Sequence, residues 1–342
     1  MEYRRVGQSG LKVSEICLVT MTFGHGADAA EAARITGTCL DAGVNFFDTA
    51  NSYAESASET MLGEALRERR REVVIASKFF NPVGPGPNDS GMSRAHIMQA
   101  IEDSLRRLRT DYLDIYYIHH VDVQAPLDEM LRAVDDLIRQ GKVRYIACSN
   151  YEAWRLMEAV WISDVQRLSR FICEQLQHSL VVRDIEEEVV PACALKGLGV
   201  VAWSPLAGGF LSGKYRPGTT KLAGTRSEEG WALPSRFFVA NHDEVLGTLL
   251  QVAAELGRTP AQTALRWSLD QPFMTSVIVG ARTVTQVQDS LDAAGWRLPA
   301  EALGRLNAVS AVPWGYLRTT AEEMAARRNN AVISPPKDQC PL

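Results

Sequence analysis

The stretch LDIYYIHHVDVQAPLDEMLRAVDDLIRQGKVRYIACS, residues 113–149, contains the unit from which the chain is built. Two runs rich in β-branched and aromatic residues, Leu113–His119 and Val143–Ser149, predict strands. Between them, Leu127–Gln140 has the apolar spacing of a helix and is followed by Gly141. Glycine is favoured directly after the last turn of a helix. The stretch therefore predicts a strand, a helix and a second strand.

The same alternation continues through most of the chain. Eight strands are expected, at Val13–Met21, Asn45–Thr49, Val73–Lys78, Leu113–His119, Val143–Ser149, Phe171–Gln175, Val200–Trp203 and Ser276–Gly280. Helices are expected at Ala29–Ala42, Ser58–Arg69, Ala95–Leu108, Leu127–Gln140, Ala153–Leu168, Ile185–Lys196, Asp243–Glu255, Ala261–Leu269 and Val284–Ala294. This pattern predicts an α/β protein with one (β/α)8 TIM barrel. We assign residues 1–312 to the barrel domain and 313–342 to a loosely ordered C-terminal tail.

A doubly wound open sheet is the competing fold, because it also alternates strands and helices. Such sheets normally bind dinucleotides at a Gly-x-Gly-x-x-Gly turn after a strand. No expected strand of this chain is followed by that turn, so the barrel is favoured. The loops that follow barrel strands form the active face. The long irregular segments 81–93 and 215–236 are therefore expected to be binding loops.

Composition and charge exclude several classes of protein. The apolar fraction of 46% and the charged fraction of 23% are those of a soluble globular protein. The net charge is −5 and the two signs are interspersed, so there is no basic stripe for nucleic acid. No apolar run is long enough to span a membrane, and the residues after Met1 do not form a signal peptide.

The six cysteines are scattered, at Cys17, Cys39, Cys148, Cys173, Cys193 and Cys340. No Cys-x-x-Cys pair or Cys/His spacing indicates a zinc site, so no metal is expected. Buried reduced thiols are the simplest interpretation, and they indicate a reducing compartment such as the cytoplasm.

Polar residues end nearly every expected strand. They are Thr20, Asp48, Lys78, His119, Ser149 with Asn150, Gln175, Trp203 with Ser204, and Gly280 to Arg282. In a barrel these positions gather at the carboxyl-terminal rim, where catalytic residues lie. The strand ends therefore predict an active site.

Asp48 and Lys78 each follow a run that should be buried, and a structural ion pair is the simplest explanation of the two charges. Tyr53 favours a catalytic interpretation, because it lies just beyond Asp48. A free tyrosine has a pKa of about 10, and a nearby ammonium stabilises the phenolate. We expect Lys78 to lower the pKa of Tyr53, so that Tyr53 protonates a carbonyl oxygen as a general acid.

His119 could orient that oxygen, but it is adjacent to His120. Neighbouring residues of a strand point to opposite faces, so only one of the two is expected to face the barrel mouth. Periodicity alone leaves open which one, and for either histidine alone a structural role is the more common interpretation.

At these residues the sequence resembles the aldo-keto reductase superfamily, in its bacterial-type or potassium-channel β-subunit-like branch. The likeness runs from about Tyr3 to Leu291. It rests on the motifs LVTMTFG (18–24), FDTANSY (47–53), ASK (76–78), DYLD (111–114), IH (118–119), GKVR (141–144), CSN (148–150), WSPLAGGFLSGK (203–214) and VIVGAR (277–282).

The resemblance implies specific roles for the strand-end residues. Asp48, Tyr53, Lys78 and His119 would be the catalytic tetrad, which favours His119 over His120. The cofactor contacts would run from the nicotinamide, through the pyrophosphate, to the adenosine. In that order they are Thr20, Met21, Asp48, Ser149, Asn150, Gln175 and Trp203; then Ser204, Pro205, Leu206, Gly208, Leu211 and Lys214; then Gly280, Arg282, Gln286 and Ser290.

The chain departs from the family pattern at Val19 and Ala54, where glycine is usual, at His178 for tyrosine, and at Ser290 for asparagine. The change at Ser290 bears on cofactor choice. The family generally prefers NADPH, and Arg282 could bind the 2′-phosphate, although a solvated surface arginine is an equally good interpretation. NADP(H) is therefore expected ahead of NAD(H).

The resemblance implies an NADPH-dependent reduction of an aldehyde or ketone, or the reverse oxidation. One alternative is a cofactor-sensing binding protein with little turnover, as in channel β-subunits. Another is a barrel aldolase that uses Lys78 as a Schiff-base amine, which would leave Tyr53 and Trp203 without a role. The sequence does not determine the natural substrate, the physiological direction or the oligomeric state.

Overall fold

The eight strands of the barrel close on one another in the order β10-β3-β4-β5-β6-β7-β8-β9, and all neighbours are parallel. The computed structural model describes residues 1–219, 221–223, 225, 227–228, 230 and 233–327. The strands are β3 (Ile16–Val19), β4 (Phe46–Asp48), β5 (Val74–Phe79), β6 (Leu113–Ile118), β7 (Val143–Ser149), β8 (Phe171–Gln177), β9 (Gly199–Trp203) and β10 (Met274–Val279). The predicted (β/α)8 barrel is confirmed.

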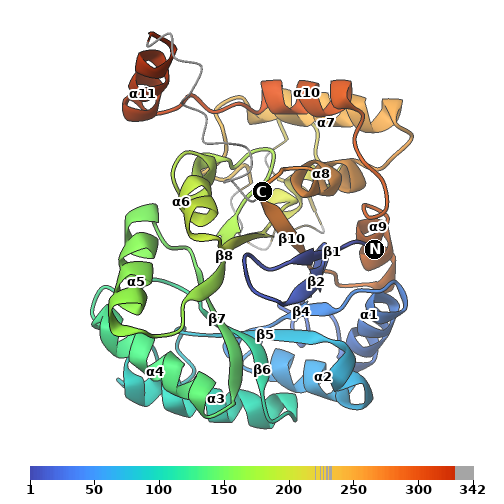
Figure 1. Ribbon diagram of the computed structural model, residues 1–342. Coiled ribbons are helices and arrows are strands. Elements are labelled where there is room, and N and C mark those ends of the chain that lie inside the picture. Colours follow the sequence, from blue (N-terminus) through green and yellow to red (C-terminus); the bar gives the residue numbers. More distant parts are fainter. Residues whose placement is uncertain (220, 224, 226, 229, 231–232, 328–342) are drawn as a thin grey trace.

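Helices surround the strands, as Figure 1 shows. They are α1 (Ala29–Asp41), α2 (Ala57–Ala65), α3 (Arg94–Leu108), α4 (Leu127–Arg139), α5 (Ala153–Gln166), α6 (Val189–Lys196), α7 (His242–Glu255), α8 (Pro260–Leu269), α9 (Val284–Leu291), α10 (Ala300–Val309) and α11 (Tyr316–Arg327). Local signals explain their starts: Asp28 accepts a bond from Glu31 N, and Thr259 forms a capping box with Gln262. Apolar side chains between helices and strands form the main core.

The predicted strand Val13–Met21 is wrong as a single element. Residues Lys12–Ser14 form β2, which pairs antiparallel with β1 (Tyr3–Arg5), and only Ile16–Val19 joins the barrel. The break lies at Glu15, whose buried carboxylate pairs with Arg4 and Arg266. A buried charge needs such partners, so the chain turns there to reach them.

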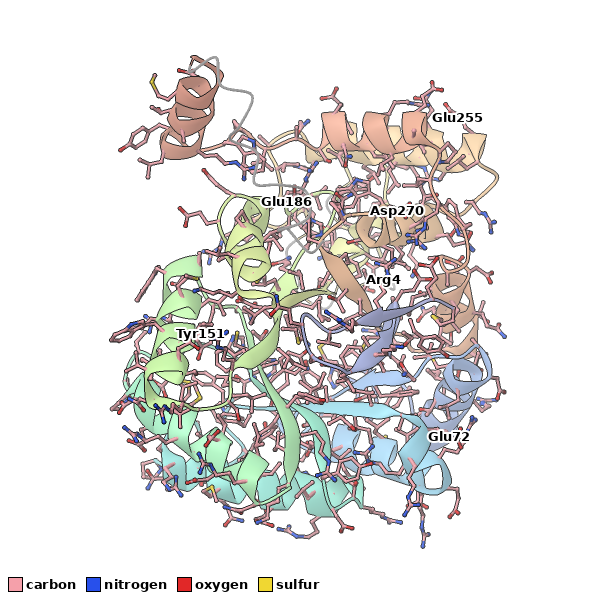
Figure 2. The ribbon with its side chains drawn as sticks, in the orientation of Figure 1. Arg4, Glu72, Tyr151, Glu186, Glu255 and Asp270 are labelled. Atoms are coloured by element: carbon pink, nitrogen blue, oxygen red, sulfur yellow. The ribbon has the colours of Figure 1, made fainter. Side chains whose placement is uncertain are left out.

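This charge cluster closes the amino-terminal end of the barrel. Arg4 also donates to the carbonyl oxygens of Leu269 (3.0 Å) and Met274 (2.8 Å), and Arg266 pairs with Asp270. Figure 2 labels Arg4, which lies on β1 of the hairpin, and Asp270, which follows the end of α8. The opposite, carboxyl-terminal end is left for the functional site.

Two further segments differ from the sequence prediction. The predicted helix Ser58–Arg69 ends at Ala65 and is followed by a kinked 3-10 turn, η1 (Arg67–Glu72). Helices α10 and α11 were not predicted; α10 contacts α7, and α11, at the top left of Figure 1, is joined to the segment before α6 by Arg318, which donates to Glu186 O (2.9 Å). Part of the segment expected to be a loose tail is thus helical, and its remainder, residues 328–342, lies outside the described residues.

Five cysteines, Cys17, Cys39, Cys148, Cys173 and Cys193, are free and buried, which confirms the prediction for these five. Cys340 lies outside the described residues. No helix of the described chain is long and apolar enough to cross a membrane. No group of three or more potential metal ligands occurs among the same residues.

Glu174 on β8 gives the fold a testable pH dependence. Its buried carboxyl accepts a bond from Tyr151 N (2.8 Å), and burial raises its pKa from 4.5 to about 8. Between these pH values the folded protein keeps a proton that the unfolded chain releases. The free energy of unfolding therefore falls as pH rises, by up to about 4 kcal/mol.

Glu174→Gln should remove this loss, because glutamine stays neutral. Urea unfolding of both proteins at pH 5 and pH 8 should show the variant gaining stability relative to the wild type at the higher pH. A difference that does not change with pH would contradict the neutral carboxyl.

Candidate active site

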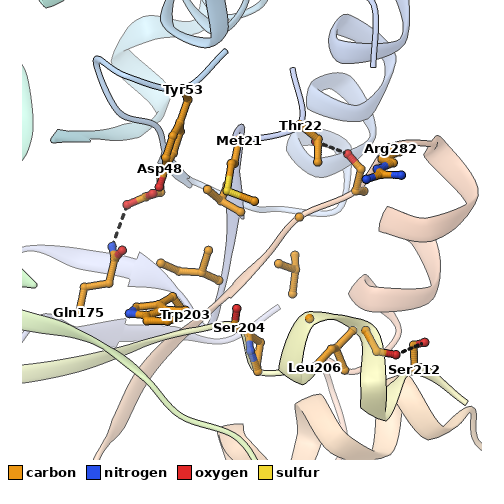
Figure 3. Close-up of a pocket in the computed structure, with 18 of the residues that line it drawn as sticks. Met21, Thr22, Asp48, Tyr53, Gln175, Trp203, Ser204, Leu206, Ser212 and Arg282 are labelled. Carbon is orange, nitrogen blue, oxygen red and sulfur yellow. Dashed lines mark hydrogen bonds between the residues drawn. The ribbon is translucent and has the colours of Figure 1, made fainter. Parts of the chain in front are cut away.

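A cavity of about 440 Å³ opens at the carboxyl-terminal end of the barrel. This volume is within the range of small-molecule sites in proteins. Figure 3 shows Tyr53 and Asp48 at one end and Arg282 and Ser212 at the other. The loops that follow the strands supply most of its wall, as the strand ends predicted.

Lys78 lies at the centre of a buried polar cluster beside this cavity. Its ammonium contacts Asp48 Oδ1 and donates to Thr49 O (2.9 Å) and to Tyr53 Oη (3.2 Å). The second carboxylate oxygen of Asp48 accepts a bond from Gln175 Nε2 (2.9 Å). The three N–H bonds of the lysine thus have three acceptors, and the residues of two of them, Asp48 and Tyr53, line the cavity.

The electrostatics of this cluster differ from the sequence expectation. The pKa of Tyr53 is raised, because burial disfavours the phenolate more than Lys78 favours it. Lys78 does lower the pKa of Tyr53, as expected, but the expected net lowering is wrong, because burial outweighs the lysine. Much of the lysine's charge is offset by Asp48, which carries the opposite charge and contacts the same ammonium.

The ion pair itself is maintained at neutral pH. Burial alone would lower the pKa of Lys78, but Asp48 and Tyr53 outweigh it and the net pKa is raised. Burial raises the pKa of the Asp48 carboxyl against the attraction of Lys78. A charged Lys78 therefore lies beside a protonated Tyr53.

His119 joins the cluster from the end of β6. Its ring lies edge-on to that of Tyr53, with 5.8 Å between centroids. Burial first, and then Lys78 and His120, lower the pKa of His119 to about 2. The imidazole is therefore neutral at physiological pH and can donate a hydrogen bond, but it does not act as an acid.

His120 also lines the cavity, so the expectation that only one histidine faces the barrel mouth is wrong. The two rings are stacked, 4.7 Å apart and 6° from parallel. Strand β6 ends at Ile118, and the alternation of faces does not continue beyond the strand.

Most of the predicted cofactor residues line the same cavity. They are Met21, Asp48, Ser149, Asn150, Gln175, Trp203, Ser204, Pro205, Leu206, Gly208, Lys214, Gly280, Arg282 and Gln286. Thr20, Leu211 and Ser290 do not lie on its wall. Thr20 is buried against Ser58, Leu211 is in the core, and Ser290 donates to Gln286 O (3.1 Å).

Several wall residues were not named as site residues from the sequence, among them Thr22, Asn81 and His120. Asn81 follows the end of β5, so the rule that polar residues at strand ends form the site could have found it. Thr22 donates to Ala281 O (2.6 Å) and so joins the loops after β3 and β10, a contact with no local sequence signal.

The loop after β9 forms an open cradle. Ser204, Ala207, Gly208 and Gly209 all have positive φ, and no atom lies within 4 Å of a Cβ built on Gly209. Left-handed residues turn backbone N–H groups into concavities that suit anions. Trp203 precedes this loop and donates through its indole to Asn150 Oδ1 (3.0 Å).

Comparison with known proteins agrees with this architecture. The sequence model of the aldo/keto reductase family matches residues 15–311. The chain belongs to the aldo/keto reductase family.

Three relatives illustrate the range of this family. The chain is 40% identical to the uncharacterized oxidoreductase YrpG of Bacillus subtilis, over 92% of this chain and 98% of that protein. It is 39% identical to a probable voltage-gated potassium channel subunit beta of Arabidopsis thaliana, over 86% and 91%. It is 32% identical to a putative aryl-alcohol dehydrogenase of Schizosaccharomyces pombe, over 87% and 93%.

As an aldo/keto reductase, the protein is an oxidoreductase that acts on small molecules. Aldo/keto reductases use nicotinamide cofactors, and the cavity fits such a group. It has an aromatic ring in Trp203, the backbone cradle after β9, and cations in Lys214 and Arg282. These features suit a ring, a pyrophosphate and a further phosphate, respectively.

Proposed function

We propose that this aldo/keto reductase reduces an aldehyde or ketone to the alcohol with NADPH, or catalyses the reverse reaction, with Tyr53 as the general acid or base. The observation that carries the proposal is the position of Tyr53 Oη. It lies on the cavity wall, 3.2 Å from the ammonium of Lys78, which Asp48 holds in turn. Among the described residues, Tyr53 is the one tyrosine whose hydroxyl bonds to a lysine ammonium.

The protein's own residues transfer the proton and orient the carbonyl oxygen. A bound nicotinamide supplies the hydride that reaches the carbonyl carbon, or accepts it in the reverse direction. The raised pKa of Tyr53 keeps its proton in place until the carbonyl oxygen gains negative charge. The proton then passes from Oη to that oxygen, giving the alcohol, and Lys78 stabilises the phenolate left behind. Neutral His119 orients the oxygen by a hydrogen bond.

The remaining predicted residues would bind and orient the cofactor. Gln175, Asn150 and Ser149 lie together, because Ser149 Oγ donates to Gln175 O (2.8 Å) and Asn150 Nδ2 to Ser149 Oγ (3.0 Å). They would hold a carboxamide, and Trp203 would stack on the ring. Met21 would contact the ring from the loop after β3, and Thr20, Leu211 and Ser290 would support the cavity wall without lining it. Free buried thiols support a cytoplasmic location.

Preference for NADPH is assigned to Arg282, at the cavity end away from Tyr53 (Figure 3). A guanidinium binds a phosphate through two parallel hydrogen bonds. Arg282→Ala should therefore raise the Kd for NADPH about tenfold or more and change the Kd for NADH by less than about twofold. Fluorescence titrations with both cofactors measure this. An equal rise in Kd for NADPH and NADH would show that Arg282 does not bind the 2′-phosphate.

The proposed function is tested by following NADPH consumption with a panel of uncharged aldehydes and ketones. Turnover of at least one compound, with the alcohol found as product, is the expected result. Absence of turnover across the panel, with NADPH still bound, would contradict it.

That second outcome would favour a cofactor-sensing binding protein. The identity of 39% to a protein named as a probable potassium channel subunit beta supports this candidate. The same assay separates the two functions, because both bind the cofactor and only the enzyme consumes it.

A further inference from the structure

Asn81 is a polar residue on the cavity wall that the mechanism above leaves without a role. Its Nδ2 lies 3.3 Å from His119 Nδ1 and 3.3 Å from Ser52 Oγ. An amide nitrogen only donates, so Nδ1 of the histidine is the acceptor in this pair. A neutral imidazole carries one proton, which must then lie on Nε2.

The backbone before Asn81 is held in an unusual conformation. Phe80 has φ +133°, which is a genuine outlier for a bulky residue. Its carbonyl oxygen accepts a bond from Gly91 N (2.8 Å), and its ring contacts the ring of His120. Strained residues persist where their surroundings fix them, and they cluster at functional sites. The chain therefore places Asn81 beside His119 against a local backbone preference.

Other contacts fix the position of His119 but not its proton. Its backbone N–H donates to Phe79 O (3.0 Å), and its carbonyl oxygen accepts from Asn150 Nδ2 (3.2 Å). The stacked ring of His120 fixes the plane of its imidazole. Because burial lowers the pKa of His119 to about 2, the ring stays neutral and one of two tautomers is always present. Asn81 is the neighbour whose hydrogen bond distinguishes them.

We propose that Asn81 is a positioning residue that holds His119 in the Nε2–H tautomer, so that this N–H donates to the substrate's oxygen. The inference rests on the proposed function, since a carbonyl compound or alcohol supplies that oxygen. In the other tautomer Nε2 would present a lone pair to the carbonyl oxygen and repel it. Asn81 thus acts on the reaction through His119.

The test uses the full chain labelled with ¹⁵N-histidine, whose long-range ¹H–¹⁵N spectra distinguish the two tautomers. His119→Gln assigns the signal. The wild type should show the Nε2–H form of His119 from pH 6 to pH 8. Asn81→Leu should show a mixture of tautomers and a kcat lower by about tenfold, with a smaller change in KM.

Two further variants make the test specific. Asn81→Asp replaces the donor with an acceptor and should convert His119 to a form with a proton on Nδ1. If Asn81→Leu does not fold, this change of tautomer in Asn81→Asp still tests the proposal. Asn241→Leu is the control, because Asn241 is an exposed asparagine outside the cavity and outside both expected binding loops, and it should leave the spectrum and kcat unchanged.

Failure of this proposal is distinct from failure of the proposed function. An Nδ1–H signal in the wild type, or an unchanged tautomer in both Asn81 variants, would overturn the role of Asn81 whatever the turnover. The wild type could instead show the Nε2–H form, with that form lost in Asn81→Leu, and yet consume no NADPH. This result would support the role of Asn81 in fixing the tautomer and count against the proposed function alone.

Discussion

Tyr53→Phe should lower kcat by about a thousandfold or more while the Kd for NADPH changes by less than about twofold. A positioned general acid contributes roughly 10²- to 10⁴-fold to a rate. Phenylalanine keeps the ring beside His119 and loses Oη, the atom that lies 3.2 Å from Lys78 Nζ. His119 does not replace the lost acid, because its pKa is lowered to about 2. Steady-state kinetics and cofactor quenching of tryptophan fluorescence give the two quantities.

Tyr117→Phe is the matched control for this variant. Tyr117 is fully buried inside the barrel, and its hydroxyl lies 3.2 Å from Cys173 Sγ. This variant tests whether the loss of any buried tyrosine hydroxyl in the barrel impairs turnover. We expect the kcat of Tyr117→Phe to stay near the wild-type value. Full turnover by Tyr53→Phe would exclude Tyr53 as the acid.

The sequence was informative where function depends on position along a strand. The runs that end in Asp48, Lys78 and Gln175 predicted both the barrel and the rim on which these residues meet. In a parallel barrel the carboxyl ends of all strands lie at one face, so residues that end successive strands in the sequence come together in the folded protein. The contacts Asp48–Lys78 and Asp48–Gln175 follow from this rule.

The sequence was less informative where the outcome depends on a balance of opposing energies. The direction of the Tyr53 pKa shift is one example, because it compares burial with the field of an ion pair. Neither quantity can be obtained from neighbouring letters. The turn at Glu15 is another, since its partners Arg4 and Arg266 lie far apart in the chain. The contact between Asn81 and His119 is a third example, because these two residues also lie far apart in the sequence.

Lys78→Met should reduce kcat about as much as loss of the tyrosine hydroxyl, and it should also destabilise the fold. Without the ammonium, no cation faces the phenolate of Tyr53, and burial raises the pKa of Tyr53 further. Asp48 loses the partner that balanced its burial. Removing one member of a buried ion pair costs about 3 to 5 kcal/mol. Urea unfolding at pH 7 measures the second effect, and kinetics the first.

The pH dependence of the stability lost in Lys78→Met identifies the cause of that loss. With Lys78 absent, we expect the folded-state pKa of Asp48 to rise further above its ordinary value of 3.8, because only the hydrogen bond from Gln175 still opposes burial. The folded variant then holds a proton that the unfolded chain releases, so its deficit against the wild type should grow as pH rises from about 4 to 7. Asp48→Asn combined with Lys78→Met should recover much of the stability at pH 7, since no buried charge remains, but none of the turnover. If the double variant is no more stable than Lys78→Met, the loss comes from packing around the lysine stem. If Lys78→Met keeps the wild-type kcat, Tyr53 works without its cation.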